Sequence, residues 1–184
     1  GGLSSSYYGV TLGAWASSVA SAEETGAEGD LYLDYQYEIN NDLSLSIGAL
    51  FYYYPFAVEQ NTSEASLSLQ SNIINASLHF SPKYFGAETS AIYILLNRAF
   101  YLNHTKTLAF DIQLGNTSFG DEIKAGNKDH IDYKFTLSHK VGELSVGIFH
   151  SDTNRILIDE QKKTSSVKDE VFGITVTREV SEKS

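Results

Sequence analysis

Three aspartates are the residues of this sequence best placed to do chemistry. Asp34, Asp111 and Asp132 each stand in a segment where polar and apolar residues alternate, and each lies among the polar positions. A row of carboxylates attracts cations, and inside a pore it would favour their entry. The predicted pore-lining residues are Asp34, Gln36, Asp111, Gln113, Asp132 and Lys134, with Asp30, Glu38 and Lys140 on the same predicted face. The alternative is that these charges pair across a wet interior and fill it.

A histidine among serines is the nearest approach to a catalytic motif. His79 stands between Ser77 and Ser81 on the polar positions of one segment. A nucleophilic serine needs a histidine base and an acid arranged in space, and two residues on one strand do not make that arrangement. We therefore expect no catalytic residues and no enzymatic activity. No histidine pair has metal-ligand spacing, and no phosphate loop is present, so we expect neither metal nor cofactor. The acidic residues Glu23, Glu24, Glu28 and Asp30 are expected to form a solvated loop, with divalent-ion binding between lipopolysaccharide molecules as the alternative.

Composition narrows the class of protein. The chain has 184 residues, enough for one domain over 1–184, and a formal net charge of −10, which argues against nucleic acid as a partner. It has no cysteine, so no disulfide framework is expected. Its longest apolar run, Ala91 to Leu96, is far shorter than the ~20 residues of a membrane-spanning helix.

Period-2 alternation is the dominant pattern and predicts β-strands with one apolar face. The predicted outward apolar positions include Leu31, Leu33, Leu45, Ile47, Phe110, Ile112, Phe135 and Ile174. We count eleven strands, the first a fragment at Gly1 to Ser4. Arg98 falls among apolar positions of the stretch Ala91 to Leu102, where a β-bulge is expected.

The connections between these strands alternate between short and long. The short ones are Asn40 to Asp42, Ser71 to Ile73, Asn103 to Thr105 and Val141-Gly142; the long ones are Ser17 to Gly29, Tyr54 to Ser63, Pro82 to Ser90, Ser118 to Lys128 and Asp152 to Asp169. An up-and-down membrane barrel has tight turns at one end and long loops at the other. The fold predicted is therefore all-β, an antiparallel transmembrane β-barrel.

Aromatic residues near the predicted strand ends support lipid on the outside. The predicted interface aromatics are Tyr7, Tyr8, Tyr52, Tyr53, Tyr54, Tyr84, Phe85 and Tyr101. Such rings form girdles at the two bilayer surfaces. A soluble barrel with its apolar face turned inward has the same period and stays the alternative.

Several segments, in order, resemble one bacterial family. They are Gly13 to Ser18, Leu31 to Tyr37, Asn41 to Ser44, Gly48 to Pro55, Lys83 to Gly86, Tyr93 to Leu102, Asp132 to Lys134 and His150 to Thr153. Together they resemble the TorF family of porins, also named Gcw_chp. The resemblance covers nearly the whole chain and implies a barrel of about twelve strands, so the first strand is expected to be truncated or missing here. The family's chains also tend to end in an aromatic residue, whereas this one ends Val180 to Ser184.

These observations together predict a protein of the Gram-negative outer membrane. We expect a porin or narrow channel that transports small solutes with a mild preference for cations. The alternative is a closed structural barrel that binds a protein or lipid partner through its wall or loops. Outer-membrane lipid and lipopolysaccharide are the expected partners, with small solutes or a protein partner in addition.

Overall fold

The computed structural model describes residues 1–20, 25–158, 163–166 and 170–178. The strands are β1 (Gly2–Tyr7), β2 (Val10–Ala20), β3 (Thr25–Asn40), β4 (Leu43–Tyr53), β5 (Thr62–Ser71), β6 (Asn75–Ser81), β7 (Ala91–Tyr101), β8 (Leu108–Phe119), β9 (His130–Val141), β10 (Leu144–Thr153), β11 (Ile156–Ile158), β12 (Thr164–Ser166) and β13 (Val171–Arg178). Three short helices lie between them: η1 (Val58–Gln60), η2 (Tyr84–Gly86) and α1 (Glu122–Ala125). The chain's last residues, including Val180 to Ser184, and the acidic residues Glu23 and Glu24 lie outside the described part.

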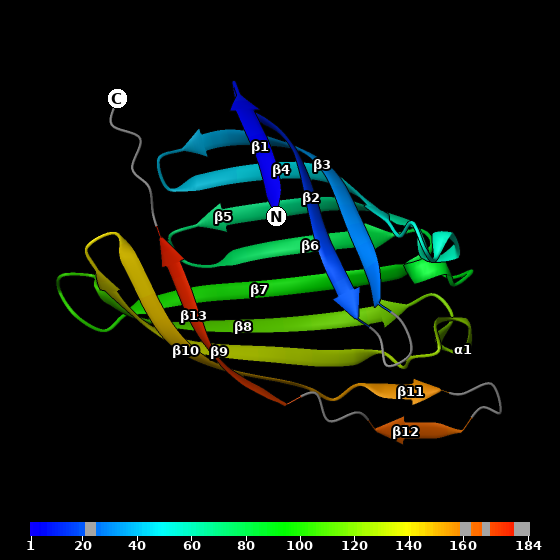
Figure 1. Cartoon of the computed structure of the whole chain (residues 1–184). Coiled ribbons are helices and arrows are strands. Elements are labelled where there is room, and N and C mark those ends of the chain that lie inside the picture. Colours follow the sequence, from blue (N-terminus) through cyan, green and yellow to red (C-terminus); the bar gives the residue numbers. More distant parts are fainter. Residues whose placement is uncertain (21–24, 159–162, 167–169, 179–184) are drawn as a thin grey trace.

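One antiparallel sheet of eleven strands contains β1 to β10 and β13, in that order. Each strand pairs with its neighbours in the chain, apart from the short hairpin β11–β12 inserted before β13. The predicted all-β antiparallel class and the count of eleven strands are confirmed. The sheet curves so that β1 to β3 and β13 lie in front of the central strands (Figure 1). Within the described residues the outer edges of β1 and β13 are unpaired, so the sheet is open.

The pairing register runs almost without interruption. Arg98 pairs with Ile112 in an unbroken ladder between β7 and β8, so the bulge expected there is wrong. Its guanidinium carbon lies 4.8 Å from the centroid of the Phe100 ring, and this cation–π contact lets a charge sit on the apolar face. The register shifts instead in β3, between Glu38 and Asn40.

Tight turns and long connections lie at opposite ends of the sheet, which follows from its antiparallel order. The helices α1, η1 and η2 and the β11–β12 hairpin gather at the long-loop end (Figure 1). Two predicted loops need correction. Most of Ser17 to Gly29 belongs to β2 and β3, and Asp152 to Asp169 contains the β11–β12 hairpin. That hairpin is tied to the end of α1, since the Ile158 amide donates to the Gly126 carbonyl at 2.8 Å.

Apolar and polar side chains are distributed in the reverse of a soluble protein. Leu31, Leu33 and Ile47 are at least half exposed, whereas Thr62, Ser81 and other hydroxyl-bearing residues are buried. Among the described residues no large side chain is fully buried. The apolar face, here called the outer face, is therefore uncovered, and the polar face, here called the inner face, is the enclosed one. None of the helices in the described part is long and apolar enough to cross a membrane.

Gly86 is a position where the long-loop end depends on glycine. Its φ is +82°, and a Cβ there would overlap the carbonyl oxygen of Glu59 in η1. Gly142, in the turn between β9 and β10, has φ +62° with nothing within 4 Å of a Cβ. We predict that Gly86→Ala costs ~1–3 kcal/mol more than Gly142→Ala, because only Gly86→Ala adds overlap to backbone strain.

Chemical unfolding followed by the fluorescence of Trp15, the single tryptophan, measures both variants. Equal losses of unfolding free energy in the two variants would show that the η1–η2 contact does not constrain the long-loop end.

Candidate functional site

The three aspartates singled out above all lie on the inner face. The pairing register places Asp34 across from Gly48, Asp111 across from Thr136 and Asp132 across from Gly115. The carboxylates thus share a face with the small and hydroxyl-bearing side chains of neighbouring strands. Their role in lining a pore stays a prediction.

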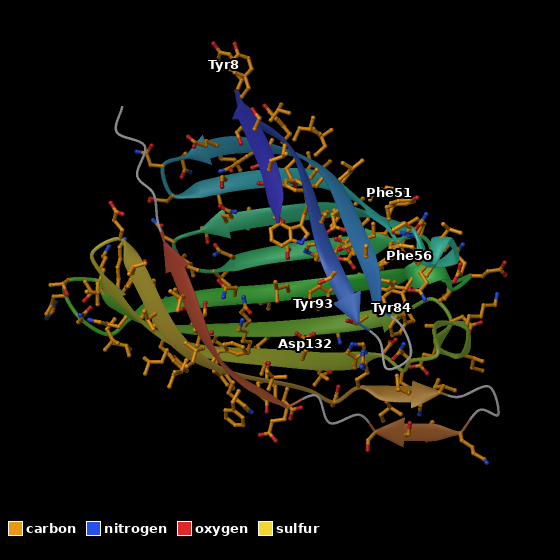
Figure 2. The ribbon with its side chains drawn as sticks, viewed as in Figure 1. Tyr8, Phe51, Phe56, Tyr84, Tyr93 and Asp132 are labelled. Carbon is orange, nitrogen blue, oxygen red and sulfur yellow. The ribbon has the colours of Figure 1, made fainter. Side chains whose placement is uncertain are left out.

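Two of these carboxylates lie flat against a glycine of the next strand. A Cβ on Gly48 would overlap the Asp34 carboxylate, and a Cβ on Gly115 would overlap both the Asp132 carboxylate and the Tyr93 hydroxyl. The Tyr93 hydroxyl donates a hydrogen bond of 3.1 Å to Asp132 (Figure 2). The absence of a side chain on these glycines is therefore what makes room for the charge at the wall.

The other predicted pore-lining residues have neighbours on the same face. The Gln36 amide nitrogen lies 3.3 Å from the Ser44 hydroxyl. Gln113 pairs in register with Lys134. The Lys134 ammonium lies 4.4 Å from the centroid of the Phe149 ring. A cation held over a ring face is attracted by the ring's negative quadrupole, and this attraction directs it toward β10.

Glu64 is an inner-face carboxylate that is not among the predicted pore-lining residues. It lies near the start of β5, where its Oε1 atom is 2.8 Å from Nδ1 of His79. The Nε2 atom of the same ring is 3.0 Å from the hydroxyl of Ser77. The pattern could have revealed it, because Glu64 continues the polar positions Ser66 and Ser68 by one further step of two.

A ring cluster at the long-loop end of the inner face consists of Tyr52, Tyr54, Tyr84, Phe85 and Phe119. Tyr84 contacts both Phe85 and Phe119, each pair having ring centroids 4.9 Å apart, and Tyr52 and Tyr54 pack on Phe85 at 6.1 and 6.3 Å. Beneath them is a cavity of about 180 Å³, whose lining includes Tyr52, Tyr84 and Phe85. A larger polar hollow of about 500 Å³, lined in part by Glu38 and Gln70, lies at the tight-turn end.

The predicted interface aromatics therefore divide into two sets. Tyr7, Tyr8, Tyr53 and Tyr101 are well exposed near strand ends, as an interface position requires. Tyr8 lies far from Phe56 and Tyr84 at the opposite end of the molecule (Figure 2). Tyr54 is only 8% exposed, and Tyr52 lines the cavity, so these two rings lie on the inner face. Tyr84 and Phe85 belong to the ring cluster.

Burial raises the pKa of the two tyrosines of this ring cluster that lie outside the strands, Tyr54 and Tyr84. Desolvation raises the pKa of Tyr54, and a hydrogen bond with the Glu28 carboxylate, together with its negative charge, adds to the shift. Desolvation also raises the pKa of Tyr84, although the positive charge of Arg155 opposes it. Both phenols are thus held in the neutral form. Within the part of the chain that the structure describes, no three histidine, aspartate or glutamate residues are grouped as a metal site would need.

The protein is an all-β antiparallel meander. Its apolar face is uncovered, and its inner face is acidic and rich in hydroxyl groups. Within that class, the chain belongs to the Gcw_chp family, described as bacterial proteins of unknown function, whose pattern matches residues 1–180. Neither the curated proteins nor the solved structures contain a match to the chain.

The buried phenol of Tyr54 predicts how stability depends on alkaline pH. An acid whose pKa is raised by folding contributes stability below its unfolded pKa, ~10 for tyrosine, and loses that contribution as the pH rises toward the folded value. We predict that Tyr54→Phe weakens the fall in unfolding free energy above pH ~10, because the variant has no phenol to ionise at this place.

The matched control is Tyr8→Phe, since Tyr8 is 83% exposed. Urea unfolding midpoints at pH 8 and pH 11 measure the effect. Identical pH dependence in Tyr54→Phe and the parent protein would contradict the burial of this phenol.

Proposed function

We propose that the sheet closes into a barrel of about twelve strands in the bacterial outer membrane, and that its interior is a narrow path for small solutes with a mild preference for cations. The observation that carries this proposal is the reversed distribution of side chains. Leu33, Ile47 and Ile174 are 50%, 60% and 73% exposed. Leaving such a face in water would forfeit ~25 cal/mol for each Å² of apolar area, whereas a bilayer would cover it.

The positions of the exposed aromatic rings also support an outer face that is turned toward lipid. Tyr7 and Tyr8 form an edge-to-face pair, with centroids 4.3 Å apart, at the turn between β1 and β2, and Tyr101 lies at the end of β7. Phe56 is 76% exposed in the connection after β4, at the other end of the strands. Rings at both ends of an apolar band fit the two interfaces of a membrane.

The narrowness of the path follows from strand number. Strands ~4.8 Å apart and tilted by ~40° give a twelve-stranded barrel a backbone radius of ~12 Å, much of which the side chains occupy. The ring cluster narrows the long-loop end further. The negative inner face, with Asp34, Asp111, Asp132 and Glu64, would favour cations, since charges in a narrow path are weakly screened.

A closed barrel that binds a partner through its wall or loops is the second candidate. The ring cluster and the interior hydrogen bonds favour it, because both occupy space that a conducting path needs. The two candidates share the membrane location and differ only in whether the interior conducts.

The membrane location predicts the cost of a charge on the outer face. Ile47 lies mid-strand in β4, between Tyr35 and Leu67 of the neighbouring strands. We predict that Ile47→Lys destabilises the bilayer-folded protein by ~2–4 kcal/mol, because the ammonium would have to enter hydrocarbon. Phe56→Lys, in a loop, should cost ~0–1 kcal/mol.

Denaturant titration in lipid vesicles compares the two variants. A tolerated Ile47→Lys in protein that partitions into the aqueous phase would remove the membrane proposal.

Cation preference is tested by neutralising the inner-face aspartates. We predict that the triple variant of Asp34→Asn, Asp111→Asn and Asp132→Asn shifts the reversal potential in a KCl gradient toward zero, because the fixed negative charge near the path is lost. The parent protein should show a small conductance favouring K⁺.

The control is Glu143→Gln, because Glu143 is exposed in the turn between β9 and β10. A folded barrel that passes no current, or passes anions preferentially, would leave the closed interaction barrel as the function.

A further inference from the structure

Glu64, His79 and Ser77 form a continuous chain of hydrogen bonds across two adjacent strands. Glu64 comes from β5, and His79 and Ser77 come from β6, where they lie two residues apart on the inner face. The pairing of Ser66 with His79 puts Glu64 diagonally across from the imidazole. The Glu64 oxygen lies 2.8 Å from Nδ1, and the Ser77 hydroxyl lies 3.0 Å from Nε2.

One neutral tautomer of the His79 ring fits both contacts. In it Nδ1 carries the ring proton and donates a hydrogen bond to the Glu64 carboxylate, which can only accept. The neutral ring then has its lone pair on Nε2, which can only accept. The Ser77 hydroxyl therefore donates to Nε2. This is the arrangement in which an imidazole can take the proton of a serine.

The surroundings hold this chain in place while leaving it open to the interior. The side chains of His79 and Glu64 are 26% and 22% exposed. The Tyr93 ring lies 5.9 Å from the imidazole, and the 180 Å³ cavity includes Glu64 and His79 in its wall. Ser77 lies beyond that cavity, one step of two residues toward the tight-turn end. When one end of a small molecule lies at Ser77, the remainder of that molecule could thus occupy the adjacent cavity.

We propose that Ser77, His79 and Glu64 are a nucleophile, a general base and a positioning acid that hydrolyse small carboxylic esters inside the sheet. Ser77 Oγ bonds to the acyl carbon as its proton passes to Nε2, and the carbon–alkoxide bond breaks as Nε2 returns that proton to the leaving alcohol. Water then gives a proton to Nε2 and its hydroxyl to the acyl carbon. The bond between that carbon and Ser77 Oγ breaks as Nε2 returns the proton to Oγ, which releases the acid and restores the serine. Ester and water become acid and alcohol, with no other reactant.

The proposed reaction also needs a hydrogen-bond donor to the developing oxyanion, and the strand register places Ser68 for this role. Ser68 lies directly opposite Ser77 in the β5–β6 register and shares its face. Side chains opposite each other in an antiparallel pair have Cβ atoms ~5 Å apart, which is within reach for a hydroxyl to stabilise the developing oxyanion. This activity is independent of conduction, because it requires only that a small ester reach the inner face.

The first test uses the full chain folded in detergent, a fluorophosphonate probe and p-nitrophenyl butyrate. We expect the probe to label Ser77, as shown by peptide mass, and Ser77→Ala to abolish labelling and lower ester hydrolysis at least ~100-fold. The matched control is Ser145→Ala, an inner-face serine on β10 that should retain both. Labelling elsewhere, or a Ser77→Ala variant with unchanged hydrolysis, would overturn the proposal.

The second test examines Glu64 as a positioning residue. We expect Glu64→Gln to lower the rate ~10- to 10⁴-fold and to move the acidic limb of the pH–rate profile toward lower pH, since the imidazolium formed in the reaction loses its carboxylate partner. A role in folding alone would leave that limb in place. Unfolding midpoints of all variants identify any loss of folded protein, and a folded Glu64→Gln variant with the parent profile would exclude Glu64 from the chemistry.

Discussion

The constraint on which the rest of this structure depends is the unbroken register of its strand pairs. Side chains alternate between the two faces of a strand, so a slip of one residue exchanges every side chain from one face to the other. From β4 to β13 the ladders of the main sheet run without a shift, and the irregularity in β3 is confined to Glu38 and Asn40. This register keeps Ile47 and Leu67 on the outer face while Ser46 and Ser68 stay inside.

The inner face is shaped by small residues as much as by charged ones. Gly48 and Gly115 leave the space into which Asp34 and Asp132 fold, and the most enclosed positions are mainly hydroxyl-bearing residues such as Thr62 and Ser81. Their hydroxyls lie 2.9 Å apart and satisfy one another. Polar groups out of contact with water need such partners, since an unpaired one costs ~1–3 kcal/mol. The interior is thus a connected polar surface on which a proton relay can be held.

The sequence predicted the strands of the main sheet and their faces well because each depends on residues close together in the chain, whereas the long connections Ser17 to Gly29 and Asp152 to Asp169 were predicted wrongly. It did not predict Glu64 beside His79, because that contact depends on the β5–β6 register, which the three residues after Ser71 do not specify. The burial of Tyr54 depends on Phe85, thirty-one positions away, and on Glu28 of another strand. The β11–β12 hairpin has strands of three residues, too short to show a period.

The order of strands in the sheet also determines how the chain can assemble. Almost every ladder joins consecutive strands, so each needs only a short loop to close, and the entropy lost on closure grows slowly with loop length. The sheet can therefore grow hairpin by hairpin from any point. Closing the sheet into the proposed barrel would instead bring together its two edges, β1 and β13, which lie far apart in the sequence. Ring closure would therefore have the highest contact order and would be the natural last step of folding.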